Sequence, residues 1–339
     1  MIPQREYFDK DIANSDNTSG YYIIEENDFV YNPRKSADAP YGPISRYKYA
    51  EAGIVSPLYL CFRAKKEINP SFFEWYFRSS AWHRYVYMSG DSGARHDRVS
   101  IKDDTFFAMP INLPSAHEQE HIASFLERID QRIEKQRALV ESLKKYKRGL
   151  VKALISGTVA FACSENKRWE TVGLAEIFTI SAGGDIDRQN SSPTYSTSYP
   201  YPVYANALTN NGLYGYANYF KVEGDSITVS GRGEVGHAIA RHCKYVPIVR
   251  LLSLVPKYED DVDFFAYMIN ATSIYIESTG VPQLTSPQLG AVKVFRPPIL
   301  EQKRISSLLL KIDAKIENEE RLTFYLEKIR SSMLQQLFI

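Results

Sequence analysis

One stretch of sequence occurs twice in this chain, and this repeat constrains the fold more than any other feature. The first copy extends from Leu113 to Ile155 and the second from Arg296 to Ile339. At a constant offset the copies share many residues, among them the pair Glu118-Gln119, which returns as Glu301-Gln302. An ungapped match of this length is an internal repeat, so the chain is built from two similar units.

Each copy of the repeat is predicted to form one long helix. In the first copy, Ser115 and Glu118 have the spacing of a capping box, and in the second copy two prolines suit a helix start. Apolar residues then recur every three or four positions, and Gly157 supplies a stop after the first copy. Polar residues interrupt the two apolar rows at Gln136, Lys147, Glu319, Thr323 and Arg330. A helical period well past ~25 residues is typical of a coiled coil, and the economical partner for each apolar stripe is the other copy.

The segments that precede the two helices also resemble each other. In the first segment, Tyr21–Pro33 is predicted to form a strand, a turn and a strand, Ile54–Phe62 a buried strand, and Pro70–Tyr87 a helix. In the second segment, strands are predicted at Tyr201–Tyr204, Asp225–Ser230 and Ile248–Val255, and a helix at Val262–Asn270. We therefore predict an α+β chain of four parts: a globular domain at 1–112, a long helix at 113–157, a globular domain at 158–296 and a long helix at 297–339.

The correspondence between the two globular segments has a gap. Residues from Trp169 to Asn218 have no counterpart before Tyr21. We therefore expect the first globular domain to be incomplete at its N-terminal side.

Composition bounds the class of protein. The sequence has no apolar run long enough to cross a membrane, and its N-terminus lacks the apolar core of a secretion signal. Three widely spaced cysteines, Cys61, Cys163 and Cys243, suit the reducing cytoplasm better than a disulfide framework. The formal net charge is +1, and no segment has the basic excess of a protein that binds DNA by bulk electrostatics. Any binding of nucleic acid must therefore use locally placed side chains.

Two motifs suggest chemistry but are weak. Gly231–Gly236 has the form G-x-G-x-x-G, yet the residues after it are too few and too polar for the helix of a dinucleotide site. A glycine turn that brings Arg232 to a ligand or to the backbone is the better reading. His237, His242 and Cys243 have no standard zinc spacing, and His117 with His121 lacks a third ligand. Because the catalytic motifs that we tested are absent, the sequence favours a binding protein over an enzyme.

The globular segments contain side chains suited to reading DNA. Arginine reads guanine edges with two hydrogen bonds, and asparagine or glutamine suits adenine. The candidates for DNA contact are Arg34, Arg46, Arg95, Arg98, Tyr195, Asn206, Asn210, Asn211, Arg232 and Gln283.

Both long helices open with the pattern P-x-x-x-E-Q-x-x-I-x-x-x-L-x-x-x-D-x-x-I. It comprises Pro114, Glu118, Gln119, Ile122, Leu126, Asp130 and Ile133 in the first copy, and Pro297, Glu301, Gln302, Ile305, Leu309, Asp313 and Ile316 in the second. The doubled pattern resembles the conserved regions of type I restriction–modification specificity subunits. Trp169 with Gly183-Gly184 resembles the start of that family's target recognition domains, and Ser230–Gly236 resembles their middle glycine turn.

This resemblance implies two target recognition domains that each read half of a bipartite DNA site. It also implies that the two long helices pair antiparallel, hold the domains apart and so set the spacing of the half-sites. Methyltransferase subunits would grip the chain and methylate adenine, and motor–nuclease subunits would complete the restriction enzyme. S-adenosylmethionine, ATP and magnesium belong to those partners, so we expect no cofactor, metal or catalytic residue in this chain.

The positions expected to pair the helices or to contact other subunits lie on the two repeats. They are Glu118, Gln119, Ile122, Leu126, Ile129, Ile133, Glu301, Gln302, Ile305, Leu309, Ile312 and Ile316. The gap in the first domain leaves other readings open: a chain that pairs with a second specificity chain, an inactive or rearranged specificity subunit, or a coiled-coil adaptor that reads no DNA.

Overall fold

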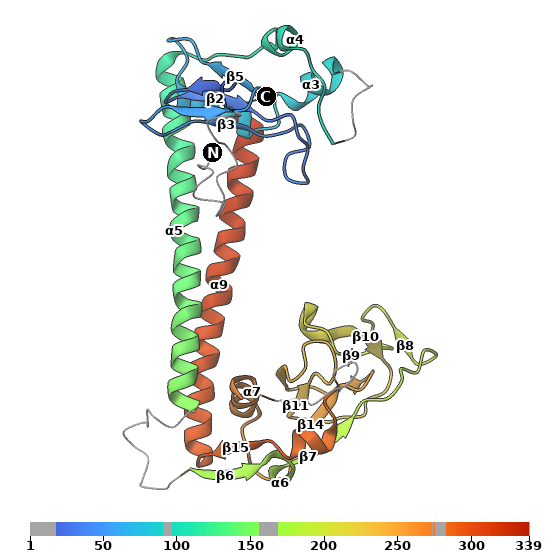
Figure 1. Ribbon diagram of the computed structural model, residues 1–339. Coiled ribbons are helices and arrows are strands. Elements are labelled where there is room, and N and C mark those ends of the chain that lie inside the picture. The colour runs from blue at the N-terminus through green and yellow to red at the C-terminus, as the bar shows by residue number, and fades with distance from the viewer. Residues whose placement is uncertain (1–17, 91–96, 156–168, 273, 275–282, 339) are drawn as a thin grey trace. The chain divides into compact units, whose positions relative to one another are not determined.

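The computed structural model describes residues 18–90, 97–155, 169–272, 274 and 283–338 (Figure 1). The chain divides into two compact units. The first unit comprises Met1–Leu139 and Glu319–Ile339, and the second comprises Val140–Asn318. Each unit contains one globular part and a segment of both long helices, α5 (Ala116–Ile155) and α9 (Ile299–Leu337). Among the described residues, no helix has the length and apolar character needed to cross a membrane.

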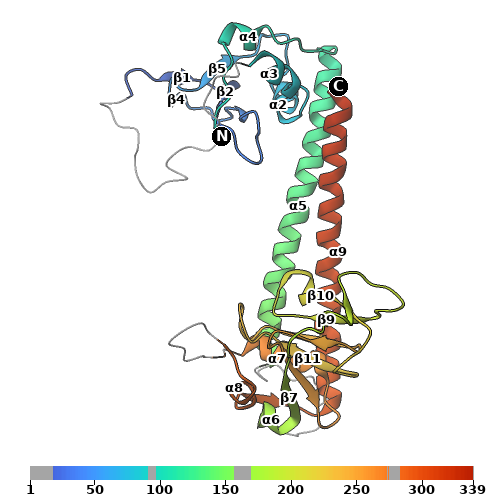
Figure 2. The same cartoon turned by 90° about the vertical axis from the view of Figure 1, so that its right-hand side faces the viewer.

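The first unit contains two small antiparallel sheets. Strand β2 (Asp28–Tyr31) lies between β3 (Ile44–Arg46) and β5 (Leu60–Arg63). Strand β1 (Tyr22–Ile24) pairs separately with β4 (Gly53–Val55), as Figure 2 shows. The predicted turn before Asp28 is present, with Asn27 at a φ of 72°, but the strands on its two sides belong to different sheets.

Helices α2 (Pro70–Arg78), α3 (His83–Ser89) and α4 (Asp103–Phe107) follow the sheets of the first unit. The core between them is aromatic, and Phe29 on β2 packs edge-to-face on Phe73 of α2 with 5.2 Å between the ring centroids. The prediction of one helix over Pro70–Tyr87 was wrong. Ser79 is extended at the end of α2, and its hydroxyl donates to the carbonyl of Tyr76 over 2.6 Å, so the helix ends there.

The prediction of one strand over Ile54–Phe62 was also wrong, because a turn separates β4 from β5. Pro57 lies in this turn and cannot donate to a sheet, and Tyr59 N–H bonds the carbonyl of Ser56 over 3.1 Å.

The second unit is richer in strands. Its elements are β6 (Glu170–Gly173), α6 (Leu174–Ile177), β7 (Phe178–Ala182), β8 (Ser191–Ser192), β9 (Tyr201–Tyr204), η1 (Thr209–Gly212), β10 (Leu213–Ala217), β11 (Ser226–Val229), β12 (Ala238–Arg241), β13 (Val246–Pro247), β14 (Leu252–Pro256), α7 (Val262–Ala271), α8 (Ser286–Gly290) and β15 (Lys293–Arg296). One sheet has the order β12-β11-β14-β7, a second has the order β13-β9-β10-β8, and β15 pairs with β6.

The prediction of one strand over Ile248–Val255 was wrong. Leu251 N–H bonds the carbonyl of Ile248 over 3.1 Å, which closes a turn, and β14 begins only at Leu252. The core of this unit lies where α7, the β11–β14 sheet and the long helices meet, with Phe264, Phe265 and Leu309 fully buried.

The two long helices run antiparallel within each unit. In the first unit, Arg330 donates to Asp130 over 2.5 Å, and Arg137 binds Glu327. In the second unit, Lys147 Nζ lies 2.5 Å from Asp313, and Leu154 shares a core with Ile305. Higher numbers in α5 therefore meet lower numbers in α9.

Most of the polar residues that interrupt the two apolar rows bond polar residues of the opposite helix, whereas Thr323 bonds the carbonyl of Glu319 in its own helix. Gln136 donates to Glu319, and Arg330 and Lys147 both find aspartates of the repeat. These contacts favour the observed alignment of the two helices, because a shift along the axis would break them and leave the buried Gln136 without its partner.

Candidate nucleic-acid interface

The glycine turn between β11 and β12 brings three of the predicted DNA-contact residues together. Gly231 N–H donates to Asn206 Oδ1 over 2.8 Å, and Leu284 N–H donates to the carbonyl of Gly231 over 2.9 Å. Arg232 donates from Nε and Nη2 to Gln283 Oε1 over 3.1 and 2.7 Å. The structure therefore joins Asn206, Arg232 and Gln283 in one network, which we call the glycine-turn cluster.

Only glycine fits at the base of this turn. A Cβ atom on Gly231 would lie 2.7 Å from the carbonyl oxygen of Arg250 and 3.2 Å from that of Leu284. Strand β12 follows the turn, so the strand–turn–helix of a dinucleotide-binding loop is not formed here.

The three members of the glycine-turn cluster play different parts. Asn206 is partly buried and uses both ends of its amide on the backbone, since it also donates to the carbonyl of Val249. It therefore braces the turn. Arg232 is exposed, and in the described part of the chain neither its Nη1 nor Gln283 Nε2 has a hydrogen-bond partner. This pair is the part of the cluster that offers donors to a ligand.

Asn210 and Asn211 lie in η1, where both have a left-handed backbone with φ values of 51° and 50°. Asparagine tolerates this conformation better than most residues. The carbonyl of Asn211 accepts a hydrogen bond from Arg241 Nη2 over 2.7 Å, and Arg241 Nε donates to Thr228 Oγ1 over 3.0 Å. The two asparagines are exposed, and their position is set from beneath by Arg241.

Sequence analysis did not identify Arg241 as a candidate. Arg241 is only 7% exposed, and its guanidinium lies 3.6 Å from the centre of the Tyr204 ring and forms no ion pair within the described residues. Burial lowers the pKa of Arg241. A buried cation without a carboxylate partner adds positive potential to the surface above it. No sequence signal distinguishes this arginine from others, because its burial results from sheet packing.

Arg250 is a second residue that sequence analysis missed. Val249 and Arg250 form the turn before β14 with φ values of 52° and 63°. Their N–H groups are held by the carbonyls of Gly184 and Gly183 over 2.9 and 3.0 Å. Asn206 accepts from Gly231 and donates to Val249, so this turn adjoins the glycine-turn cluster and presents the exposed Arg250 beside it.

Tyr195 is exposed on the connection between β8 and β9 and packs edge-to-face on Tyr216, with ring centroids 5.5 Å apart. No contact within the described part of the chain joins Tyr195 to the glycine-turn cluster.

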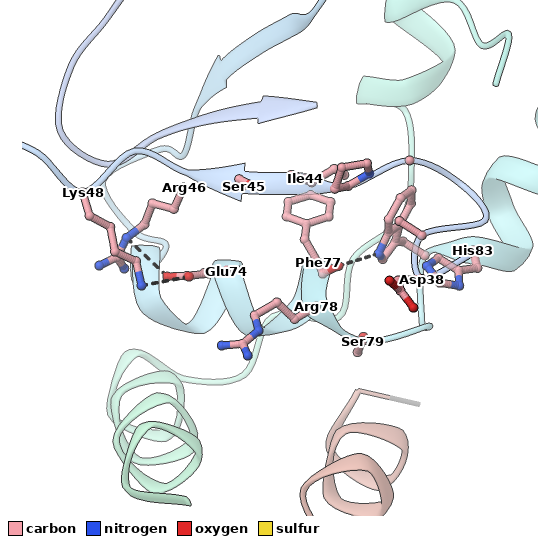
Figure 3. Close-up of a pocket in the computed structure, with 14 residues that line it drawn as sticks. Asp38, Ile44, Ser45, Arg46, Lys48, Glu74, Phe77, Arg78, Ser79 and His83 are labelled. Carbon is pink, nitrogen blue, oxygen red and sulfur yellow. Dashed lines mark hydrogen bonds and ion pairs between the residues drawn. The ribbon is translucent and has the colours of Figure 1, made fainter. Parts of the chain in front are cut away.

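In the first unit, the side chain of Arg46 bonds other residues of the same globular part. It donates to Ser71 Oγ over 2.8 Å, and with Lys48 it flanks Glu74 at 3.5 and 2.9 Å. Arg46, Lys48 and Glu74 line a cavity of about 470 Å³ between β3 and α2, where Figure 3 shows both cations turned toward Glu74. Arg46 therefore ties the sheet to the helix.

The other candidates of the first unit lie elsewhere. Arg34 and Arg98 face each other in an antiparallel bridge, with Arg34 exposed and Arg98 partly buried. Arg95 lies outside the described residues.

The predicted interface residues of the two repeats divide into two groups. The apolar group lies in the helix pair, where Leu126, Ile133, Ile305, Leu309 and Ile316 are buried and Ile122, Ile129 and Ile312 are partly buried. The glutamines of the Glu-Gln pairs instead bond the globular parts. Gln119 Oε1 accepts from Asn69 N–H over 2.8 Å, and Gln302 Oε1 accepts from Asp261 N–H over 2.9 Å. Asn69 and Asp261 are the N-caps of α2 and α7, so each glutamine joins a long helix to its own globular part.

No metal site forms among the described residues, where no group of three or more potential ligands gathers. His242 instead lies between Asp225 at 2.9 Å and Asp263 at 3.1 Å. Burial lowers the pKa of His242, but the hydrogen bond with Asp225 and the charge of Asp263 outweigh it and raise the pKa.

The chain is similar to specificity subunits of type I systems. A protein of Mycoplasma pneumoniae named as a type I specificity subunit is 32% identical over 111 residues, which make up 33% of this chain and 31% of that protein. A protein of Methanocaldococcus jannaschii, named as the specificity subunit of the restriction enzyme MjaX, is 27% identical over 260 residues, covering 71% of this chain and 61% of that protein. The chain thus spans less than two thirds of the length of these relatives.

Solved structures share the fold. The S subunit from M. genitalium superposes with a TM-score of 0.59 at 17% identity, over 93% of this chain and 84% of that one. The HsdS subunit from Thermoanaerobacter tengcongensis gives a TM-score of 0.53 at 17% identity, over 93% of this chain and 81% of that one. The family profile described as type I restriction modification DNA specificity domain matches residues 10–144 and 166–328. Because this match covers most of the sequence, the chain belongs to the type I restriction–modification DNA specificity family.

Proposed function

We propose that this chain selects the DNA sequence on which a type I restriction–modification complex acts, without catalysing a reaction itself. The observation that carries the proposal is the exposed Arg232–Gln283 pair on the glycine turn of the second unit, in a chain of the DNA specificity family. An arginine oriented by a glutamine presents planar donors in a fixed direction, which suits a base edge in the major groove.

The surroundings of this pair suit the DNA backbone. Arg250 is exposed on the adjoining turn, and Arg241 lies buried beneath the two asparagines of η1. Contacts to phosphates position a protein on DNA, while contacts to base edges give specificity. We assign phosphate contact to Arg250 and base contact to Arg232 with Gln283.

The long helices would serve assembly with the methyltransferase and motor–nuclease subunits. In the first unit, the helix pair exposes apolar side chains at Phe125, Phe324, Tyr325 and Ile329. Exposed apolar groups of this size on a helix are typical of a surface for other subunits. S-adenosylmethionine, ATP and magnesium would be bound by those partners, and the complex would work in the cytoplasm, where its DNA lies.

The test is co-expression of the chain with methyltransferase subunits of a type I system, followed by mapping of adenine methylation. The expected result is methylation of one bipartite motif. Arg232→Ala should relax the motif at one position, at a cost of roughly 1–3 kcal/mol in binding. Lys257→Ala removes an exposed cation of the same unit that only bonds the carbonyl of Ala175, and it should leave the motif unchanged.

Arg250→Ala should weaken binding to all sequences alike and reduce the slope of log K against log salt by about 1. A complex that assembles but neither binds DNA nor methylates a split motif would contradict the proposal. It would leave the chain as an adaptor that joins proteins.

A further inference from the structure

The two units contain the same three-strand arrangement in the same register. In the first unit, β2 lies between β3 and β5, with Phe29 opposite Phe62. In the second unit, β11 lies between β12 and β14, with Ile227 opposite Leu254. Strand β5 is therefore the counterpart of β14.

The outer edges of these two counterparts differ. Strand β7 covers the outer edge of β14, with Ile180 opposite Leu254. No strand among the described residues covers the outer edge of β5. The consequence is visible in burial, since Leu252 and Leu254 are 1% and 0% exposed whereas Leu60 and Phe62 are only partly buried. An uncovered edge leaves unpaired backbone donors and acceptors, which is the usual route by which a strand recruits another chain.

The helix beside the open edge determines what can bind there. By the offset of the repeat, Phe107 at the end of α4 corresponds to Gly290 at the end of α8. A Cβ atom on Gly290 would lie 2.9 Å from the Cβ of Ala175 on α6, so the second unit packs a helix closely at this place. Phe107 fills the corresponding place in the first unit, 57% exposed and with its ring centroid 6.0 Å from that of Phe62. A segment with a helix before its strand, such as α6–β7, does not fit there, whereas a bare strand does.

We propose that the outer edge of β5 pairs with β5 of a second copy of this chain. The pairing is antiparallel about a two-fold axis, so each copy completes the other's three-stranded sheet. A second copy supplies the required occupant, because β5 is itself a bare strand edge with apolar residues on its core side. Isologous contacts of this kind are the commonest form of homodimer.

The register of the pair follows from side-chain alternation and charge. Directly opposed residues share a face of the sheet, so Leu60 and Phe62 must face the partner's Leu60 or Phe62. Centring the axis on Cys61 places Leu60 opposite the partner's Phe62 and keeps the two Arg63 side chains far apart. Centring it on Phe62 would place Leu60 opposite the partner's small Ala64 and would bring the two arginines, each already paired with Asp28 and Glu25, into diagonal contact. Cys61 then lies opposite the partner's Cys61, with Cα atoms about 4.5–5.5 Å apart, within the range that a disulfide spans.

Oxidative cross-linking of the full chain tests this arrangement. The variant C163S/C243S keeps only Cys61, and its matched control C61S/C163S keeps only Cys243. Copper–phenanthroline accepts two electrons for each disulfide formed, and both thiols release their protons. Cys243 is the more exposed thiol, and burial raises the pKa of Cys61, so random collisions would favour Cys243. We expect the Cys61 variant to form a covalent dimer at least tenfold faster than the Cys243 variant. Equal rates, or faster reaction of the Cys243 variant, would overturn the proposal.

A second measurement needs no cross-link. The paired edge is short, and interfaces below ~1,200 Å² are typical of weak association, so the dimer should appear in sedimentation equilibrium only at high protein concentration. Cys61→Lys places two ammonium groups directly opposite each other and should abolish the dimer, whereas Cys243→Lys should not. Both variants should keep the circular dichroism and melting of the parent chain. A dimer that survives Cys61→Lys, or a parent chain that stays monomeric at the highest concentration, would exclude this edge as the contact.

Discussion

The two units begin their long helices with the same Glu-Gln pair, but they use the glutamate differently. Each glutamine accepts a hydrogen bond from the N-cap of a short helix, α2 or α7. Glu301 is buried and accepts the indole N–H of Trp169 over 3.1 Å, whereas Glu118 is exposed and caps its own helix through Ser115. Trp169 has no counterpart among the described residues of the first unit. A repeated residue therefore keeps its role only where the element that it contacts is also repeated.

The largest expected loss of stability comes from replacing the buried leucines at equivalent positions of the two repeats. Leu126→Ala and Leu309→Ala each open a cavity at a side chain that is fully buried, and each should lower the free energy of unfolding by about 2–5 kcal/mol. Leu309 belongs to the larger apolar cluster, so its loss should be the greater. Urea unfolding followed by circular dichroism measures both. The exposed Leu310→Ala is the control and should change little, and a smaller loss for Leu309 than for Leu126 would contradict this ranking.

The next largest loss of stability should come from replacing the glutamines of the two Glu-Gln pairs. Gln302 bonds Asp261, Pro297 and Asp260, whereas Gln119 bonds only Asn69 and Pro114. Removing a buried partner costs about 1–3 kcal/mol, so Gln302→Ala should lower the free energy of unfolding more than Gln119→Ala. Chemical denaturation of the two variants compares them directly. Equal losses would show that the extra bond from Gln302 to Asp260 contributes nothing.

The stability of the second unit should depend on pH through the ion pair that joins a strand end to a short helix. Lys48, just after β3, pairs with Glu74 on α2, and His242, just after β12, pairs with Asp263 on α7. Because the folded state raises the pKa of His242, its stabilisation is present below the unfolded pKa of about 6.5 and is lost as the pH rises through the folded pKa.

We expect the stability of the second unit to fall modestly between about pH 6 and pH 8 for this reason. His242→Gln should remove this pH dependence of the stability. Lys48→Gln should change the stability by a similar amount at each pH, so the pH dependence should remain. Thermal melts across this pH range provide the measurement. A wild-type profile that is flat there, or one that His242→Gln leaves unaltered, would argue against the bridge.

The smallest effect should come from the ion pairs that the repeats form with each other. Asp130 pairs with Arg330 in the first unit, and Asp313 pairs with Lys147 in the second. Burial raises the pKa of Asp130, but the hydrogen bond from Arg330 and the charge of Arg78 outweigh it and lower the pKa. Partly exposed pairs contribute about 0.2–1 kcal/mol. Each aspartate has a further partner, which is Arg78 for Asp130 and the hydroxyl of Tyr267 for Asp313. Double-mutant cycles with asparagine and methionine should give the larger coupling for Asp130, whose further partner is a cation. A larger coupling for Asp313 would contradict this order.

Much of the architecture could be predicted from local signals. The apolar period predicted both long helices, the spacing of Ser115 and Glu118 predicted the capping box, and the glycines at 231–236 predicted a turn at Arg232. Each of these signals acts within one turn or one helix, so neighbouring residues determine it.

Two failed predictions have local causes, since Ser79 ends α2 through a bond to Tyr76 and Pro57 lies in the turn between β4 and β5. The other failures concern places where distant residues decide. Val249 and Arg250 carry no turn signal, yet the carbonyls of Gly183 and Gly184 hold them in a left-handed conformation. Arg250 was therefore read as part of a strand and missed as a surface cation. Asn206, proposed as a base reader, instead braces the backbone, because two turns meet at its amide.

The sequence by itself determined that the chain repeats a globular segment followed by a long helix that opens with a Glu-Gln pair, because a repeat and a helical period are properties of neighbouring residues. Only the tertiary structure decided which side chains are used within the fold and which sheet edge no other described strand covers. Those outcomes depend on hydrogen bonds between residues far apart in the chain, such as Gly231 with Asn206 and β7 with β14, and no local pattern encodes them.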